Sequence, residues 1–369
     1  MKLTKHKLGE LLRVTRGASL PGTGYADEGR YLRLTLANFH EEGGFKDFKS
    51  TQGKYFIEPF DSRFLMHKGD LITPLTEQSP GLLGSVAFIP CDDLYIQSQD
   101  VGLITCNTEK LDKTFAYYLF LTHSVREQIS ARSQQTKIRH TSPDKIADVE
   151  VHIPDMPTQL RIAGVLGSID EKIELNRKKI AELEALAKTI YEQFIAIGQC
   201  DFTTVGDEVS VVTGKRDSNF ATEDGTYRFF TCSKEKLMCP EYEFEGKAIL
   251  LSGNGDLHAR FFSGKFNAYQ RTYVLIPRNE RLFSSMFFAV QSTLSRLTNG
   301  AAGSIVKFIT KCDVEKISVP VFSNRVQNVL NSIFDVILCA ESVVEESVHL
   351  RDTLLPLLMN GQVEVRGEK

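Results

Sequence analysis

The feature of this sequence that most constrains its fold is an internal repeat with a period of roughly half the chain. Both halves open alike, because residues 8–17 and 205–214 place glycine and apolar residues in the same order. Further pairs of similar segments follow in order: residues 69–73 with 246–251, 97–104 with 269–276, 136–140 with 304–308, and 146–151 with 314–319. The last two pairs share one offset, so insertions and deletions have collected earlier in each half. Such a chain is expected to fold as two similar domains.

A long segment with helical periodicity follows each repeated unit. Apolar residues recur there in alternating steps of three and four, which is the pattern of a coiled-coil seam. The predicted seam residues are Ile162, Leu166, Ile169, Ile173, Asn176, Ile180, Leu183 and Ile190 in the first segment and Leu330, Phe334, Ile337, Val344, Val348 and Leu355 in the second. Gly198 is expected to end the first helix as a C-cap. Glu341 and Arg351 interrupt the second seam, and Pro356 should kink or break that helix near its end.

These patterns predict a mixed α/β (α+β) fold with a pseudo-twofold internal repeat. Two similar domains, residues 1–155 and 199–322, are separated by two long helices, residues 156–198 and 323–369, which we expect to form an antiparallel coiled coil. A helix of about 38 residues is roughly 57 Å long, so the pair would hold the domains at a fixed separation that suits a split target. Asn176 at a seam position either fixes the register of the pair or caps an irregularity.

The composition narrows the classes of function. Hydrophobic residues make up 42% of the chain and charged residues 25%, as in ordinary globular proteins, and the longest apolar runs are too short to cross a bilayer. No signal peptide opens the sequence, so we expect a cytoplasmic protein without membrane contact. The seven cysteines are scattered and form no C-x-x-C pair, so neither a metal site nor a cofactor is predicted. A formal net charge of -3 excludes a nonspecific coat for nucleic acids.

Several segments around the first long helix carry a resemblance. They are Lys137–Pro143, the Ile-Pro pair at 153 and 154, Gln159, the apolar positions from Ile162 to Ile173, and Ala187–Phe194. In this order and spacing, and with their duplication, the chain resembles over nearly its whole length the specificity (S) subunit of type I restriction-modification systems. Such families often carry a Pro-Pro-Leu and Glu-Gln signature before the central helix. Residues 154–159 depart from that signature here, and the second copy keeps only Gln327.

The resemblance implies that the two domains are target-recognition domains, each of which binds one half of a bipartite site in double-stranded DNA. It also implies that the long helices dock two methyltransferase (modification) subunits, and that restriction or translocase subunits can join the complex. Bond chemistry belongs to those partners, so the chain itself is predicted not to be an enzyme. The near-neutral charge agrees with weak DNA binding by the isolated chain, because partners would supply further phosphate contacts.

Loop residues able to read base edges or hold phosphates are the candidates for DNA contact, because Arg pairs with guanine and Gln or Asn with adenine. In the first domain they are Thr76, Gln78, Ser79, Gln97, Gln99, Gln134, Gln135, Lys137 and Arg139. In the second domain they are Lys215, Arg216, Asn254, His258, Arg260, Gln270, Arg271 and Lys307. Each residue taken singly is equally well explained as a solvated polar side chain, and the set as a whole is the firmer prediction.

Two alternatives stay open on the sequence alone. The first is an enzyme with a cryptic nuclease or methyltransferase site, although the chain lacks the Asn/Asp-Pro-Pro-aromatic tetrapeptide of amino-methyltransferases and a G-x-x-x-x-G-K-S/T phosphate loop. Gly253–Asp256 is better explained as a turn, and Glu245–Lys247 lacks the acidic partner of a nuclease site. The second alternative is a pseudo-symmetric scaffold that binds protein and not DNA.

Overall fold

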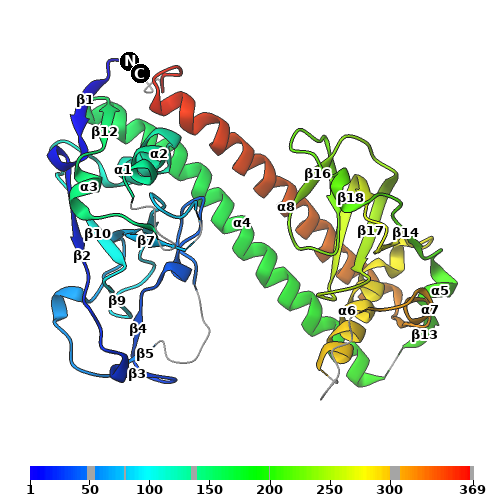
Figure 1. The fold of residues 1–369 in the computed structure, drawn as a ribbon. Helices are drawn as coiled ribbons and strands as arrows, with labels where there is room; N and C mark the ends of the chain where they lie inside the picture. Colours follow the sequence, from blue (N-terminus) through cyan, green and yellow to red (C-terminus); the bar gives the residue numbers. More distant parts are fainter. Residues whose placement is uncertain (48–54, 79, 134–138, 199, 300–307, 366–369) are drawn as a thin grey trace. The chain divides into compact units, whose positions relative to one another are not determined.

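The structure, a computed structural model, describes residues 1–47, 55–78, 80–133, 139–198, 200–299 and 308–365 (Figure 1). Helices and strands alternate along these residues, so the predicted mixed α/β class is confirmed. The chain divides into two compact units: unit 1 comprises Met1–Lys172 and Ser347–Lys369, and unit 2 comprises Ile173–Glu346. None of the helices in the described part of the chain is long and apolar enough to span a membrane.

Unit 1 has two four-stranded sheets, with strand orders β2-β10-β6-β8 and β3-β5-β4-β9, and two short antiparallel pairs, β1 with β12 and β11 with β7. The strands are β1 (Thr4–Lys7), β2 (Leu12–Arg16), β3 (Tyr25–Ala26), β4 (Tyr31–Arg33), β5 (Tyr55–Phe56), β6 (Leu71–Pro74), β7 (Thr76–Glu77), β8 (Ala87–Phe88), β9 (Tyr95–Ile96), β10 (Val101–Cys106), β11 (Arg139–His140) and β12 (Glu150–Ile153). The short helices are α1 (Lys113–Leu121), α2 (His123–Ala131) and α3 (Pro143–Ala147).

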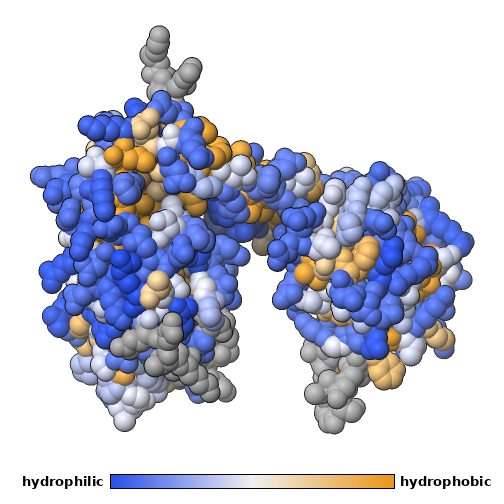
Figure 2. All heavy atoms as spheres, turned by 45° about the horizontal axis from the view of Figure 1, so that its top comes forward, coloured by the Kyte–Doolittle hydropathy of each residue, from blue (hydrophilic) through white to orange (hydrophobic). Residues whose placement is uncertain are grey.

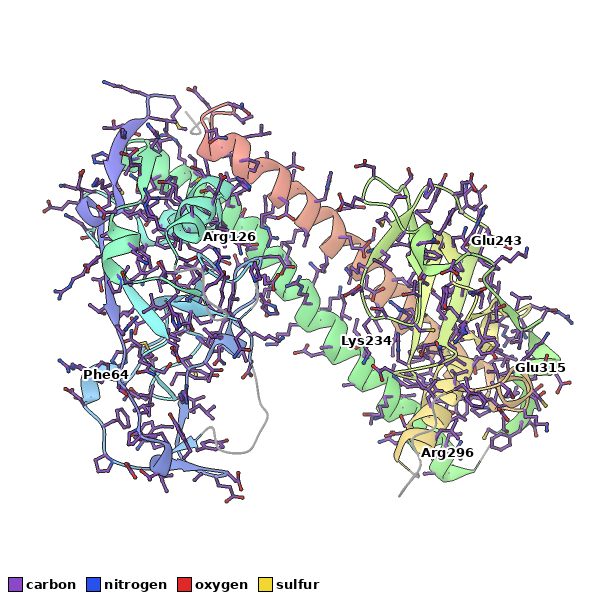
Figure 3. The ribbon with its side chains drawn as sticks, viewed as in Figure 1. Phe64, Arg126, Lys234, Glu243, Arg296 and Glu315 are labelled. Atoms are coloured by element: carbon purple, nitrogen blue, oxygen red, sulfur yellow. The ribbon has the colours of Figure 1, made fainter. Side chains whose placement is uncertain are left out.

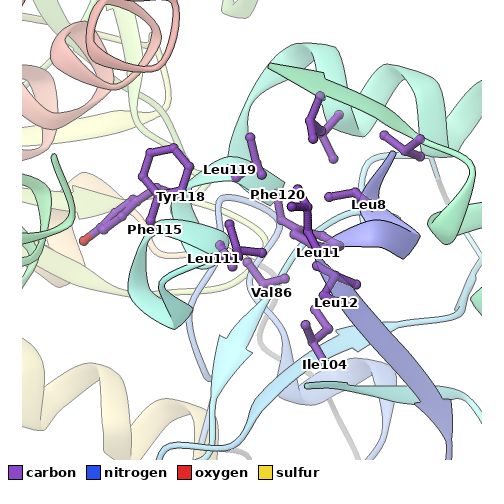
Figure 4. Close-up of a cluster of buried hydrophobic side chains, with 14 of the residues drawn as sticks. Leu8, Leu11, Leu12, Val86, Ile104, Leu111, Phe115, Tyr118, Leu119 and Phe120 are labelled. Atoms are coloured by element: carbon purple, nitrogen blue, oxygen red, sulfur yellow. The ribbon is translucent and has the colours of Figure 1, made fainter. Parts of the chain in front are cut away.

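The main core of unit 1 lies between its first sheet and helix α1 (Figure 4). Asp112 caps α1, because its side chain accepts a hydrogen bond from the Phe115 amide at 2.8 Å. The helix then turns Phe115 and Phe120 inward, where they join Leu8 and Leu11 in one buried cluster. Burial of each such side chain stabilises the fold by about 1.5–3 kcal/mol.

Unit 2 is organised around one six-stranded sheet of order β14-β19-β17-β18-β15-β16, with β13 and β20 forming a separate antiparallel pair. The strands are β13 (Asp201–Thr204), β14 (Val212–Thr213), β15 (Tyr227–Phe230), β16 (Leu237–Cys239), β17 (Phe244–Ser252), β18 (Ala259–Ala268), β19 (Thr272–Leu275) and β20 (Ser318–Val321). The short helices are α5 (Val205–Glu208), α6 (Phe283–Asn299) and α7 (Lys311–Glu315). Its core is rich in aromatic residues, and Phe261, Phe283 and Phe287 all contact Phe334.

The two long helices are α4 (Met156–Ile197) and α8 (Asn324–Met359). Every predicted seam residue is buried or half-buried. In unit 2 the helices run antiparallel, because Glu184 of α4 lies near Glu341 while Tyr191, one to two turns later, shares a core with Leu330. The predicted C-cap is confirmed, since Gly198 follows α4 with a φ of +72°. Pro356 lies in the last turn of α8, which ends at Met359.

The two units repeat the same main-chain contacts. Matched pairs of hydrogen bonds are Leu8 N to Val149 O (2.9 Å) with Val205 N to Ile317 O (3.0 Å), Leu75 N to Asp100 O (2.8 Å) with Gly253 N to Arg271 O (2.8 Å), and Thr141 N to Leu75 O (2.9 Å) with Ile309 N to Gly253 O (3.0 Å). These bonds match Asp100 with Arg271, whereas the sequence alignment of 97–104 with 269–276 matches Asp100 with Thr272. The structure thus corrects that alignment by one residue, because apolar patterning alone leaves strand register open across loops of unequal length.

Candidate nucleic-acid interface

Loops that are far apart in the sequence meet at one polar edge of unit 2, which we define as residues 214–216, 231–234, 253–260 and 269–271. The Gly253 amide donates to the Arg271 carbonyl at 2.8 Å, and the Gln270 amide donates to the Arg216 carbonyl at 2.9 Å. Lys234 and Asp256 form an ion pair at 2.7 Å. This edge gathers seven of the predicted contact residues: Lys215, Arg216, Asn254, His258, Arg260, Gln270 and Arg271.

The cations of this edge differ in how they are neutralised. Arg216 pairs with Glu241 at 2.9 Å and its guanidinium lies 4.4 Å from the centroid of the Phe220 ring, while Lys215 pairs with Glu243. Gln270 and Arg271 are exposed, and no carboxylate in the described part of the chain pairs with Arg271. Gln270 and Arg271 are therefore free to meet a ligand without breaking an ion pair.

His258 and Asn254 lie at the same turn, between β17 and β18. The Nδ1 atom of His258 lies 2.8 Å from the Asp256 carbonyl oxygen, so Nδ1 must carry the proton that is donated. Burial lowers the pKa of His258, which favours the neutral ring, and its Nε2 atom is buried without a partner among the described residues. Asn254 is half-buried and forms an isolated bridge with Phe308.

Unit 1 has a corresponding polar edge, formed by residues 15–18, 75–78, 97–100 and 139–141. The Ala18 amide donates to the Gln97 carbonyl at 3.0 Å, and β7 pairs with β11 at the base of the edge. Gln78 and Gln99 are exposed, whereas Thr76 is only 5% exposed. Ser79, Gln134, Gln135 and Lys137 lie outside the described residues, as does Lys307 of the second domain.

Gln97 and Arg139 are used inside unit 1. Gln97 is only 2% exposed, and its amide Nε2 donates to the carbonyls of Thr15 (2.7 Å) and Val101 (2.9 Å). Arg139 pairs with Glu77 at 2.8 Å and also donates to the side chains of Ser130 and Ser133. The donors of both side chains already have protein partners. Both side chains therefore stabilise the edge from within unit 1.

Glu77 organises the start of the loop that follows β7. It is 1% exposed, and its Oε2 accepts from the amides of Gly81 (3.1 Å), Leu82 (2.9 Å) and Leu83 (2.9 Å). Sequence patterns gave no sign of this role, since an isolated Glu after a strand is usually solvated. The role of Glu77 becomes apparent only in the structure, where the amides of the loop after β7 lie around its carboxylate.

A group of basic residues beside the edge of unit 2 was also missed from the sequence. Arg177 of α4, Arg228 of β15 and Lys236 line a hollow together with Lys234 and Arg260. Figure 3 labels Lys234, which lies in the loop between β15 and β16. Two lysines separated by one residue in a polar loop were the only available signal. Across the described ranges, no group of three or more His, Cys, Asp or Glu residues could hold a metal ion.

Comparison with known proteins shows which families and structures this chain resembles. Residues 2–185 match the family model described as Type I restriction modification DNA specificity domain. The chain is 32% identical over 173 residues to the specificity subunit of the type I restriction enzyme EcoDI from Escherichia coli, covering 44% of this chain and 39% of that protein. It is 26% identical over 139 residues to the HindI specificity subunit from Haemophilus influenzae, covering 37% and 30%. These alignments thus span less than half the length of either curated relative.

A solved structure shares the fold over nearly the full chain. The S subunit of a Type-I restriction-modification system from M. genitalium superposes with a TM-score of 0.64 at 17% sequence identity. The superposition covers 97% of this chain and 96% of that chain. At this level of identity the likeness establishes the fold.

Proposed function

The chain belongs to the family of type I restriction-modification DNA specificity domains, and on that premise we propose that it is the specificity subunit of a type I restriction-modification complex. In this role it binds a bipartite site in double-stranded DNA and performs no bond chemistry itself. The observation that carries the proposal is the pair of similarly built polar edges, one in each unit. Each edge presents amide or guanidinium side chains, which are the groups that read base edges in the major groove.

The proposed contact residues are those that are not engaged inside the protein. In unit 1 they are Gln78 and Gln99. In unit 2 they are Asn254, Gln270 and Arg271, with Lys215 and Arg216 able to exchange their carboxylate partners for phosphate. We assign residues 1–155 and 199–322 to the two target-recognition domains and residues 156–198 and 323–369 to the conserved helices.

The long helices are the proposed docking surface for two modification subunits. Several large apolar side chains on them are exposed: Leu160, Leu175 and Leu186 on α4, and Val329, Val336 and Leu350 on α8. The three residues on α8 are spaced by multiples of seven, so they lie on one face of that helix. Hydrophobic residues are visible among the mostly hydrophilic ones on the face drawn in Figure 2. A partner helix would bury such a stripe.

The test is co-expression of this chain with the modification subunit encoded beside it, in the cytoplasm of a bacterial host. Adenine methylation of the host DNA is then mapped by single-molecule sequencing. We expect a gapped motif that disappears when this chain is omitted. Arg271→Gln should relax the motif in one half, while Lys316→Gln, an exposed change after α7, should leave it unchanged. Methylation that is indifferent to the chain would reject the proposal and favour a protein-binding scaffold.

A further inference from the structure

A hollow with a positive lining lies in unit 2, beside the polar edge defined above. It has a volume of about 330 Å³ and is bounded by β15, β18, the loop after β15, and parts of α4 and α8. Its basic side chains are Arg177, Arg228, Lys234, Lys236 and Arg260, and its acidic ones are Glu235, Glu341 and Glu345. Phe230 and Phe262 form part of the wall, with ring centroids 5.1 Å apart. The lining therefore offers an excess of positive charge against an apolar wall.

Among the cations that line this hollow, Arg177 and Arg260 form no ion pair within the described ranges, and of these two only Arg260 is half-buried. Its Nη2 donates to the carbonyl of Thr231 at 3.0 Å and to that of Ser233, and its guanidinium lies 5.3 Å from the centroid of the Phe230 ring. No carboxylate in the described ranges forms an ion pair with it. Burial and the nearby Arg228 both lower the pKa of its guanidinium. A half-buried cation in this state is stabilised when an anion binds.

The acidic residues of the hollow do not supply that anion, and Glu235 forms no ion pair within the described ranges. Glu345 is already shared, because it pairs with Arg228 and lies 3.3 Å from Lys236. Burial and the neighbouring Glu184 raise the pKa of Glu341 to about 7, so Glu341 carries only part of a negative charge at neutral pH. The side chain of Arg228 is 18% exposed and its pair with Glu345 faces the same space as Arg260.

We propose that this hollow receives a backbone phosphate of the DNA half-site bound by unit 2, held by Arg260 with support from Arg228 and Arg177. The inference rests on the proposed function and extends it from base reading to the grip on the DNA backbone. Guanidinium groups suit this task because their donors match two phosphate oxygens at once. The hollow and the polar edge share the loop after β15, because Arg260 donates to the carbonyls of Thr231 and Ser233 while the Cys232 Sγ lies 3.4 Å from the Arg271 carbonyl oxygen. A strand whose bases meet the polar edge would therefore bring its phosphates to Arg260.

The experiment uses the full complex of this chain with the modification subunit and a duplex that carries the gapped site. Dissociation constants are measured between about 50 and 200 mM salt for wild type, Arg260→Gln, Arg177→Gln and the control Lys316→Gln. Arg177 on α4 and Lys316 directly after α7 are both exposed, so neither change should disturb folding. Arg177→Gln therefore keeps the test valid if Arg260→Gln loosens the loop that it braces.

Each lost phosphate contact should lower the slope of log K against log salt by about 0.9, which makes the fall in affinity across this range roughly threefold to fourfold smaller. We expect this for Arg260→Gln and Arg177→Gln, with a binding loss on the order of tenfold for Arg260→Gln and an unchanged methylation motif. A duplex with one neutral methylphosphonate linkage in the second half-site should weaken the wild type and leave Arg260→Gln unaffected.

If the wild-type complex binds the gapped site and all three variants show its salt slope, the phosphate site is overturned and the proposed function still stands. A wild-type complex with no preference for any gapped site would overturn both. Inorganic phosphate at millimolar concentration is added as a competitor of the labelled duplex. If it displaces the duplex from the wild-type complex as effectively as unlabelled duplex does, the hollow is an adventitious anion site only and the proposal fails.

Discussion

The two units share one main-chain framework but hold their sections of the long helices in different ways. In unit 1, Asp170 of α4 accepts hydrogen bonds from Tyr118 (2.7 Å) and from Arg351 of α8 (3.0 Å). In unit 2, the helix pair instead brings together two acidic residues, Glu184 and Glu341. Glycine and apolar positions therefore set the repeated geometry, whereas the charges between the helices differ from one unit to the other.

Two glycines at matching positions of the main-chain framework should be the least tolerant of substitution. A Cβ atom at Gly214 would lie 1.8 Å from the Ala268 carbonyl oxygen, and one at Gly17 would lie 2.4 Å from the carbonyl oxygens of Gln97 and Ser98. Gly214→Ala and Gly17→Ala should each destabilise the protein by about 3 kcal/mol or more, because backbone must move. Urea denaturation checks this against Gly22→Ala, where a Cβ meets nothing within 4 Å. A harmless change at either glycine would break the equivalence of the units.

The next effect concerns the ion pair in unit 1. Asp170→Ala leaves the phenol of Tyr118 (2% exposed) and the guanidinium of Arg351 without their shared acceptor. We expect a loss of about 2–3 kcal/mol in the free energy of unfolding, since both donors are largely buried. Asp352→Ala, which removes the exposed partner of Arg351, should cost well under about 1 kcal/mol. Equal costs for the two variants would contradict the special role of Asp170.

Two glutamines at matching positions should differ in their contribution. Gln159 accepts from the Asp112 amide (3.0 Å) and donates to the carbonyls of Lys110 and Pro154, whereas Gln327 bonds the hydroxyls of Ser284 and Ser285. Gln159→Ala should cost about 2 kcal/mol, because fixed main-chain groups lose their partner. Gln327→Ala should cost about 1 kcal/mol, because the serine hydroxyls can rotate to helix carbonyls. Thermal unfolding of both variants ranks them, and the reverse order would refute this reasoning.

The smallest effect is the pH dependence of unit 2. The folded pKa of Glu341 is about 7, above its ordinary value of 4.5, so the folded state binds the proton more tightly than the unfolded state. Stability therefore falls as pH rises from about 4.5 to 7 and stays low above that range. Glu341→Gln should stabilise the protein by about 1 kcal/mol at pH 8, after allowance for solvent screening, and by nothing at pH 4. Glu174→Gln on α4 serves as the exposed control. If Glu341→Gln raised the free energy of unfolding equally at all pH values, the titration of Glu341 would not be the cause.

The sequence predicted the features that repeat along the chain. Heptad spacing predicted seam positions that the structure buries or half-buries, and Gly198 predicted the end of α4, because both depend on local periodicity and backbone conformation. The two seam positions that broke the pattern, Glu341 and Arg351, are the ones engaged by charges. Their partners, Glu184 and Asp170, could not be predicted, because the partner of a charge between helices depends on the axial offset of the pair.

The candidate site was less accessible to sequence reasoning. Polar composition selected Gln97 and Arg139 together with Gln99 and Arg271, yet buried Gln97 and half-buried Arg139 bond within unit 1, whereas Gln99 and Arg271 are exposed. Side-chain direction in short strands depends on a register that the sequence leaves open. The hollow around Arg260 arises from segments more than a hundred residues apart, such as Arg228 and Glu345, so only the fold reveals it.

Whether each unit binds its own half of the DNA site can be measured by exchanging residues 199–322 for the corresponding domain of another specificity subunit and mapping adenine methylation in the host. We expect a gapped motif in which one half changes to that of the donor, while the other half and the gap are retained. A motif that changes in both halves, or in neither, would contradict the claim that each unit binds its own half of the DNA site.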